Sequence, residues 1–413
     1  MKIVPDIPDY YVDRARWCGL LLFAAAGFEF PGVAGSAALL LLVVAFARHG
    51  DCLRACLQRP VFQIPLLFAL WVLVRAGLRY LEVPAERDLI LEWTGYYIVA
   101  SGLPALVLAA LLAADRRRIL WVLNAALAAL LLSLIAHSGV DDIRAYMSGQ
   151  RAFYGLGNAS SLYIVTGMLG VVLFAPWGKA RDAASRFALG YSCLALILLS
   201  LALVWQQNRS VLVAALVVIP LVGYLRFGRR SATAGPNRGL GLFVAVLFLA
   251  VLLVFVGGLR DRFAAGLETV QPEPAVSERM RLWQVGWESV LEHPFTGSGP
   301  GSVSQLVRTD ELVNRHSQLH NLYLQLLVET GLVGLLLYCL LLVVLVRALR
   351  YPYPASDGGE VTLFAGGALA LFLLVNLTQI RIDGEHAMFY VTLLYALIMT
   401  AALNSRTQDP GVS

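Results

Sequence analysis

Residues 279–301, RMRLWQVGWESVLEHPFTGSGPG, begin the longest polar interruption in an otherwise apolar chain. The interruption runs on to Gly334 and closes on a hydrophobic run from Leu332 to Val346. The polar loop that contains these residues, 258–331, is about 70 residues long and lies between two apolar segments, so it is too long to be a simple connector, and its aromatic residues argue against disorder. We therefore expect the chemistry of this protein to reside in this loop.

The composition is that of a membrane protein. The chain has 413 residues, of which 59% are hydrophobic and 14% are charged, a departure from soluble composition that long apolar segments produce. Residues 1–16 are polar and two apolar segments follow in succession, so we expect no cleavable signal peptide. The five cysteines show neither a disulfide framework nor the spacing of zinc ligands.

Apolar runs of about 17 to 25 residues are long enough to cross a bilayer, and the chain contains about twelve of them. We expect an all-α polytopic membrane protein. Residues 1–257 would hold helices one to nine, residues 258–331 a large helical periplasmic loop, and residues 332–413 helices ten to twelve and a cytoplasmic tail. The expected spans are 17–31, 33–48, 61–80, 90–113, 119–137, 157–176, 187–206, 210–226, 239–258, 331–348, 361–380 and 386–404.

The short loops predict the orientation. Arginine and lysine accumulate in cytoplasmic loops, and with alternating spans the basic clusters, such as 116–118 and 226–238, fall on one side. Both termini are then expected inside. The loops that open on the other side, and that can share one site, are 137–156, 206–210, 258–331 and 380–386.

Several arginines fall on this outer side against the charge rule, namely Arg151, Arg209, Arg279, Arg281 and Arg308. Long translocated loops are exempt from the rule, and interfacial arginines extend to lipid headgroups, which accounts for most of them. It accounts poorly for Arg209, because this residue ends a minimal connection between two apolar helices. An ionisable residue at such a place is a functional candidate that pairs with an anion or lines a cavity.

Three stretches resemble motifs of the O-antigen ligase and polymerase superfamily, which assembles bacterial envelope polysaccharides, and the ligase branch is the most similar. Residues 320–334 contain His-Asn, nine positions and Gly-Leu-Val-Gly, which resembles the ligase signature of histidine, a small polar residue, nine positions and Gly-x-x-Gly. Residues 279–299 are similar to the family's Arg-x-x-x-Trp and His-Pro-x-x-Gly-x-Gly elements. Residues 208–210, Asn-Arg-Ser, resemble its Ser-Arg turn, with asparagine in place of the first serine. The resemblance covers roughly residues 145 to 345.

The resemblance implies a glycosyltransferase that works by a metal-independent, inverting mechanism without a cofactor. The implied donor is a glycan on undecaprenyl pyrophosphate, and the implied acceptor is lipid A-core oligosaccharide. The reaction would take place on the periplasmic side of the bacterial inner membrane, with the lipid bilayer as a further partner and no nucleic acid. An O-antigen polymerase and a protein O-oligosaccharyltransferase of the same superfamily are the alternatives. A secondary transporter fits less well, because the polar residues gather in one outer loop and no internal repeat is visible.

His320 is the candidate catalytic base. The ordinary pKa of histidine, near 6.5, suits removal of a proton from an acceptor hydroxyl at neutral pH. The alternative is a structural histidine that caps a helix or packs at its N-terminus. His316 lies one helical turn earlier, but neither a third ligand nor an Asp-x-Asp motif accompanies the pair, so we expect no metal site and interpret His316 as a surface or substrate-contact residue.

Arg209 and Arg279 are the candidates that hold the donor diphosphate, with Arg151 as a weaker third, because a guanidinium can grip two phosphate oxygens at once. For Arg151 the alternative is extension to the headgroups. Arg281, two positions from Arg279, is expected to point away into solvent. The supporting residues are Asn321, Trp283, Gly331 and Gly334.

The spacing of apolar residues predicts an amphipathic helix over 277–292. We expect it to lie on the membrane surface, with Trp283 and Trp287 at headgroup depth and the helix roofing the site. The glycines of residues 297–301 favour a turn over a phosphate-binding loop, because no strand and helix of the nucleotide-binding kind flank them. Gly331 and Gly334 are expected to let the tenth span pack closely against a neighbour.

Overall fold

The computed structural model describes residues 60–112, 116–137, 160–175, 182–206, 208–227, 274–310, 317–350, 359–380 and 385–404. These residues form helices and the turns that join them, with no strand among them, so the expected all-α class is confirmed. The expected spans 17–31, 33–48 and 239–258 lie outside the described residues.

Three helices in the described ranges are long and apolar enough to cross a membrane. They are α3 (Pro60–Glu82), α9 (Ala183–Gln206) and α15 (Leu322–Ala348). The helices with shorter apolar segments are α6 (Arg116–His137), α8 (Ser160–Phe174), α10 (Arg209–Phe227), α16 (Glu360–Val375) and α17 (Glu385–Asn404). The count of about twelve spans, the orientation and the periplasmic position of the loop stay predictions.

The chain divides into two compact units. The second unit comprises Ala126–Glu273 and Gly358–Val375, and in it α8 packs against α9, α10 and α16. Arg226 of α10 forms an ion pair with Glu360 of α16 at 2.5 Å. The first unit comprises Met1–Ala125, Pro274–Asp357 and Asn376–Ser413. Its further elements are η1 (Pro84–Glu86), α4 (Arg87–Ala100), α5 (Leu103–Leu112), α13 (Pro274–Glu292) and α14 (Ser302–Arg308).

The expected span 90–113 is two helices, α4 and α5, so the prediction of one continuous helix was wrong. Gly102 separates them with a φ of +83°, which an L side chain rarely adopts. A Cβ at this position would lie 2.9 Å from Cδ2 of Tyr395 on α17. The glycine therefore provides both the turn and the space for α17. A hydropathy window does not detect a one-residue interruption of this kind.

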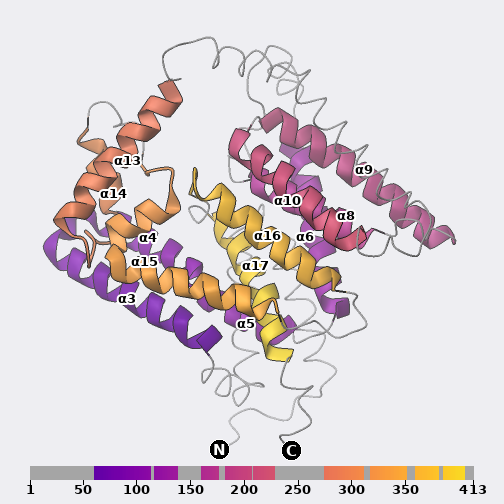
Figure 1. The fold of residues 1–413 in the computed structure, drawn as a ribbon, viewed down its shortest axis with the longest axis horizontal. Helices are drawn as coiled ribbons and strands as arrows, with labels where there is room; N and C mark the ends of the chain where they lie inside the picture. The colour runs from indigo at the N-terminus through magenta and orange to yellow at the C-terminus, as the bar shows by residue number, and fades with distance from the viewer. Residues whose placement is uncertain are drawn as a thin grey trace, which may run out of the picture. The chain divides into compact units, whose positions relative to one another are not determined.

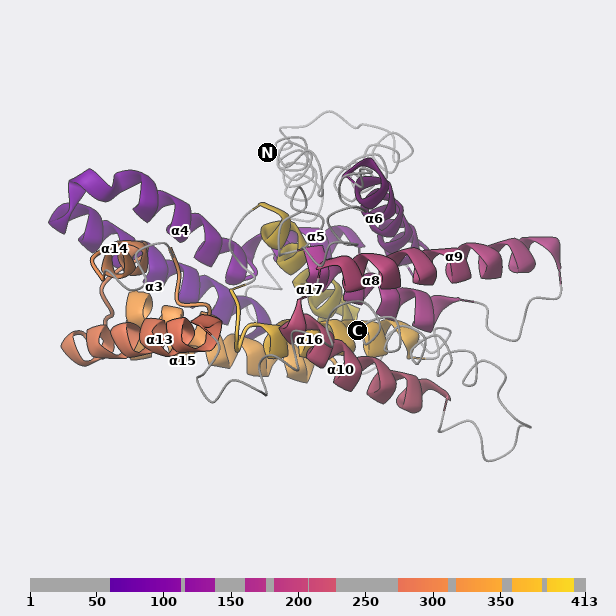
Figure 2. The same cartoon turned by 90° about the horizontal axis from the view of Figure 1, so that it is seen from above.

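Helix α15 is central to the first unit, where it packs against α3, α13, α14 and α17. Figure 1 shows α3, α4, α13 and α14 gathered around α15, and Figure 2 shows the same group from above. Full burial of an aliphatic side chain stabilises the fold by about 1.5 to 3 kcal/mol, so the apolar cluster between α13, α14 and α15 fixes their arrangement. Its buried members are Leu282, Val290, Val303, Val307, Leu319 and Val328.

Candidate functional site

Helix α15 is interrupted at Gly331, whose φ of +69° and ψ of −174° are not helical. This backbone region is essentially restricted to glycine. The helix begins at Leu322, nine residues before the expected start of the span at residue 331. An interruption deprives neighbouring carbonyls and amides of their partners within the helix, so these groups need other partners.

The glycine-rich turn, residues 293–301, supplies most of those partners. Two of its amides donate to carbonyls of α15, and two of its carbonyls accept from amides of α15. The bonds are Ser298 N to Val328 O at 2.8 Å, Gly299 N to Glu329 O at 2.9 Å, Leu332 N to Pro294 O at 2.9 Å and Val333 N to Phe295 O at 3.3 Å. The indole nitrogen of Trp71, on α3, donates to Thr330 O at 2.8 Å.

These hydrogen bonds between the turn and α15 require a glycine in each of the two segments. A Cβ on Gly331 would lie 2.2 Å from Phe295 O, and a Cβ on Gly297 would lie 2.5 Å from the nitrogen of Gly331. Gly331 thus admits the turn, which corrects the expectation that it contacts a neighbouring span. Gly334 fits that expectation, because a Cβ there would lie 3.1 Å from Nε1 of Trp71 on α3. The amides of Ser298 and Gly299 donate to carbonyls of α15, as expected of a turn rather than a phosphate-binding loop.

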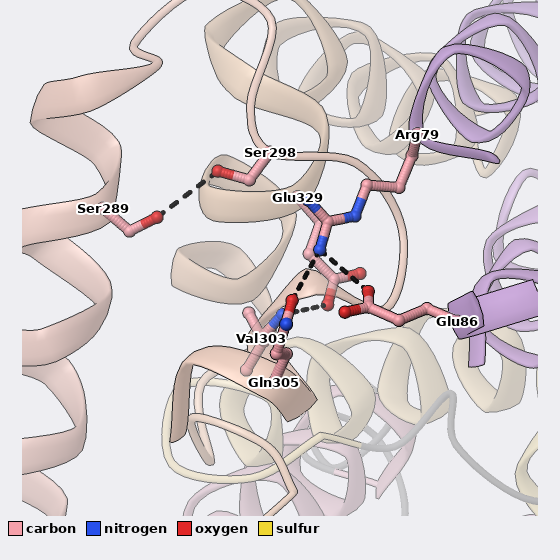
Figure 3. A network of polar contacts seen from close by, with 7 residues as sticks. All are labelled: Arg79, Glu86, Ser289, Ser298, Val303, Gln305 and Glu329. Carbon is pink, nitrogen blue, oxygen red and sulfur yellow. Dashed lines mark hydrogen bonds and ion pairs between the residues drawn. The ribbon is translucent and has the colours of Figure 1, made fainter. Parts of the chain in front are cut away.

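Two arginines of α3 lie beside the turn: Arg75 bonds it, and a Cβ on Gly299 would lie 2.7 Å from Cβ of Arg79. Arg75 is 7% exposed, and its Nη2 donates to Gly297 O at 2.7 Å. Nη2 of Arg79 donates to Glu86 and to Gln305 of α14, each at 2.8 Å (Figure 3). Sequence reasoning missed both residues, although a cation within an apolar run is itself a signal of function or pairing.

His320 lies in the turn before α15. Its φ of +53° is left-handed, and it is the one non-glycine residue of the described ranges with a positive φ. Asn321 is the N-cap of α15, since its side-chain oxygen accepts from the amides of Tyr323 and Leu324, each at 3.1 Å. Asparagine is among the best N-cap residues. The helix is therefore capped by Asn321, and His320 does not serve as its cap.

The backbone carbonyl and amide of Leu319, the residue before His320, are both hydrogen-bonded to side chains. Nε1 of Trp283 on α13 donates to Leu319 O at 3.0 Å. The amide of Leu319 donates to Oε1 of Gln325 at 3.2 Å. Trp283 also packs against the apolar cluster, and the expectation that its indole lies at headgroup depth stays a prediction.

Arg279 lies on α13 one helical turn before Trp283. Residues four apart on a helix share a face, with about 5 to 6 Å between their Cβ atoms. The structure thus brings Arg279, Trp283, His320 and Asn321 to one part of the first unit. Arg281, which was expected to point into solvent, is partly exposed and also paired: its Nε and Nη2 donate to Oδ2 of Asp310 at 3.0 and 2.7 Å.

The predicted amphipathic helix is confirmed as α13. Leu282, Val285 and Val290 are buried, whereas one apolar row on the opposite side is exposed. Its members are Met280, Trp287 and Leu291, at 62%, 53% and 66% exposure, with Phe295 at 65% just beyond the helix. The contact of this row with a membrane surface stays a prediction.

Arg209 is the first residue of α10, in the second unit, and its side chain is outside the described residues. Arg151 and His316 are also outside them. Oδ1 of Asn208 accepts from the amide of Val211 at 3.4 Å, and its Nδ2 donates to Ser161 of α8 at 3.0 Å. Asn208 therefore caps α10, as serine would, and also hydrogen-bonds to α8. The meeting of Arg209 with Arg279 and His320 stays a prediction.

Within the described ranges, no three His, Cys, Asp or Glu side chains gather as a metal site would require. The absence of a metal or cofactor from the reaction stays a prediction.

Comparison with known proteins adds one match. Residues 194–339 match the family model described as O-antigen ligase. The matched range includes Arg209, Arg279, His320 and the glycine-rich turn, whereas Arg151 precedes it. A search of curated proteins found no match.

Proposed function

We propose that this protein transfers a glycan from undecaprenyl pyrophosphate to lipid A-core oligosaccharide, because residues 194–339 match the family model described as O-antigen ligase. The reaction takes place at the periplasmic face of the bacterial inner membrane. The observation that carries the proposal is the fixed left-handed turn with His320, bonded through Leu319 to the helix that bears Arg279.

In the proposed reaction, His320 is the base and takes the proton of the acceptor hydroxyl. The hydroxyl oxygen attacks the anomeric carbon of the donor sugar and forms the new C–O bond. The bond from that carbon to the diphosphate oxygen breaks, and its electron pair leaves with the diphosphate. A single displacement inverts the anomeric configuration, and no metal or cofactor takes part.

Arg209 and Arg279, with Arg151 as a weaker third, hold the diphosphate and stabilise its growing charge. Of the two arginines at the start of α13, Arg281 is occupied by Asp310. The assignment of Arg279 rests on its place in the Arg-x-x-x-Trp element, one helical turn before Trp283.

The alternatives within the superfamily use the same donor and differ in the acceptor. An O-antigen polymerase joins donor units to each other, and a protein O-oligosaccharyltransferase transfers the glycan to a protein. A secondary transporter would bind the donor without turnover.

Reconstitution of the purified protein with a defined polyprenyl-pyrophosphate glycan tests the proposal. Three acceptor conditions are compared in the presence of EDTA: lipid A-core, donor alone and a pilin-type protein. We expect an inverted product on lipid A-core in EDTA, and loss of all but a residual rate with His320→Ala of unchanged melting temperature. Product from donor alone would identify a polymerase, and glycosylated pilin would identify a protein transferase. Binding without turnover would identify a transporter.

A further inference from the structure

The left-handed conformation of His320 needs support from its surroundings. A left-handed backbone is unfavourable for an L-residue because its Cβ comes too close to the following carbonyl oxygen, although histidine adopts it more often than most residues. Such a conformation persists where neighbouring groups fix it. Because the imidazole follows its backbone, the groups that hold residues 317–321 also set the direction of the ring.

Gln325 is the main internal support of this turn. It is fully buried in the first half of α15, and its Oε1 accepts from the amide of Leu319 at 3.2 Å. An amide nitrogen can only donate, so the oxygen of Gln325 must face Leu319. The Nε2 of Gln325 then faces Glu329, where it donates to Oε1 at 3.4 Å.

Glu329 extends this bridge to two other helices. Its Oε2 accepts from the hydroxyl of Tyr97 on α4 at 2.8 Å, and its Oε1 accepts from the amide of Val303 on α14 at 3.3 Å. Figure 3 shows Glu329 beside Val303. Glu329 and Tyr97 are fully buried. The amide before His320 is therefore connected to α4, α14 and α15, while Trp283 holds the adjoining carbonyl from α13.

We propose that Gln325 is a positioning residue for His320, acting through the amide of Leu319 without touching the substrate. The inference rests on the proposed role of His320 as base. Without the bridge, the turn relaxes and the imidazole moves away from the acceptor hydroxyl. A misplacement of about 1 Å lowers catalysis by roughly 100-fold. The donor diphosphate, held by arginines elsewhere, binds as before.

The test is Gln325→Leu, which nearly preserves the side-chain volume and removes both hydrogen bonds. We expect kcat for transfer to lipid A-core to fall about 10- to 100-fold, with KM for the polyprenyl-pyrophosphate donor unchanged within about twofold. Thr330→Val is the matched control. Thr330 is also fully buried in α15, but its hydroxyl donates only to Leu326 O within the helix. Wild-type kcat in Gln325→Leu, or an equal loss in Thr330→Val, overturns the proposal.

A double-mutant cycle separates positioning from a general structural role. In the His320→Ala background, Gln325→Leu should cause no further loss of the residual rate, because its effect passes through the imidazole. A further loss as large as in the wild-type background overturns the proposal.

Trp283→Phe covers the case in which Gln325→Leu does not fold, as judged by melting temperature and gel filtration. This variant keeps an aromatic side chain, although a smaller one, and removes the bond to Leu319 O. We expect a smaller fall in kcat at constant KM, and wild-type kcat overturns the proposal. An active His320→Ala protein refutes the base assignment itself. An inactive His320→Ala protein with wild-type rates in both other variants refutes the positioning role alone.

Discussion

The guanidinium of Arg75 donates to the carbonyl oxygen of Gly297 at 2.7 Å, which ties a candidate membrane-spanning helix to the turn that fills the break in α15. The alternation of spans predicted from the sequence would put the end of α3 and the long loop on the same side of the membrane. The bond between Arg75 and Gly297 agrees with that arrangement.

Replacing Arg75 by methionine should destabilise the protein. The substitution leaves a buried carbonyl without its donor, and hydrogen bonds to charged groups contribute about 1.5 to 3 kcal/mol. We expect a lower melting temperature in detergent. Arg308→Ala is the control, because Arg308 is exposed on α14 and surface substitutions usually change stability by less than about 0.5 kcal/mol. Equal melting temperatures for Arg75→Met and wild type would show that the bond contributes nothing.

Gly331→Ala should disrupt the contact between α15 and the glycine-rich turn. The new Cβ would lie 2.2 Å from Phe295 O, in a backbone conformation that costs an L-residue about 1 to 3 kcal/mol. Thermal unfolding and protease cleavage within 293–301 measure the effect. Gly77→Ala, on α3, has nothing within 4 Å of its Cβ and should be neutral or stabilising. The same melting temperature in both variants would contradict the interpretation.

Substitution by lysine should lower kcat/KM at Arg279 but not at Arg281, the other arginine of α13. Arg279→Lys loses paired contact with the diphosphate, and the loss of about 1.5 to 3 kcal/mol corresponds to roughly 10- to 100-fold in kcat/KM. Arg281→Lys weakens only the pair with Asp310. Arg281 is 35% exposed, so this pair contributes at most about 1 kcal/mol of stability, and kcat/KM should not change. Comparable losses in both variants would remove the assignment of Arg279.

The exposed row of α13 should lie in the lipid headgroup region. Nitroxide labels at Met280, Trp287 and Leu291 of the liposome-reconstituted protein, one at a time, should be relaxed by oxygen more than by a polar reagent, as at an apolar interface. A label at Glu288, exposed beside the row, should show the reverse. Polar accessibility at all three apolar positions would place α13 away from the bilayer.

The length of apolar runs predicted most described helices well, among them α3, α6 and α10. It could not predict the break at Gly102 or the early start of α15 at Leu322. Both depend on single residues: Gly102 makes room for Tyr395 of a distant helix, and Asn321 caps α15.

The candidate site was predictable only for the residues with a motif. His320, Arg279 and Trp283 were identified by spacing and resemblance, and the structure brings them to one region. Gln325 and Tyr97 were not identified, because a buried hydrogen bond between distant helices leaves no local pattern. Glu329 did leave a signal, since an acidic residue within an apolar run needs partners.

The break in α15 has a consequence for how this helix is made. A continuous apolar helix can enter the bilayer alone, because its backbone bonds to itself, whereas each unbonded group in lipid costs several kcal/mol. Residues 322–348 depend on Trp71 and the glycine-rich turn for five such bonds, and both precede Gly331 in the chain. Ribosomal synthesis therefore delivers the receiving surface first, and insertion of this segment becomes an assembly step onto earlier helices rather than an independent partitioning event.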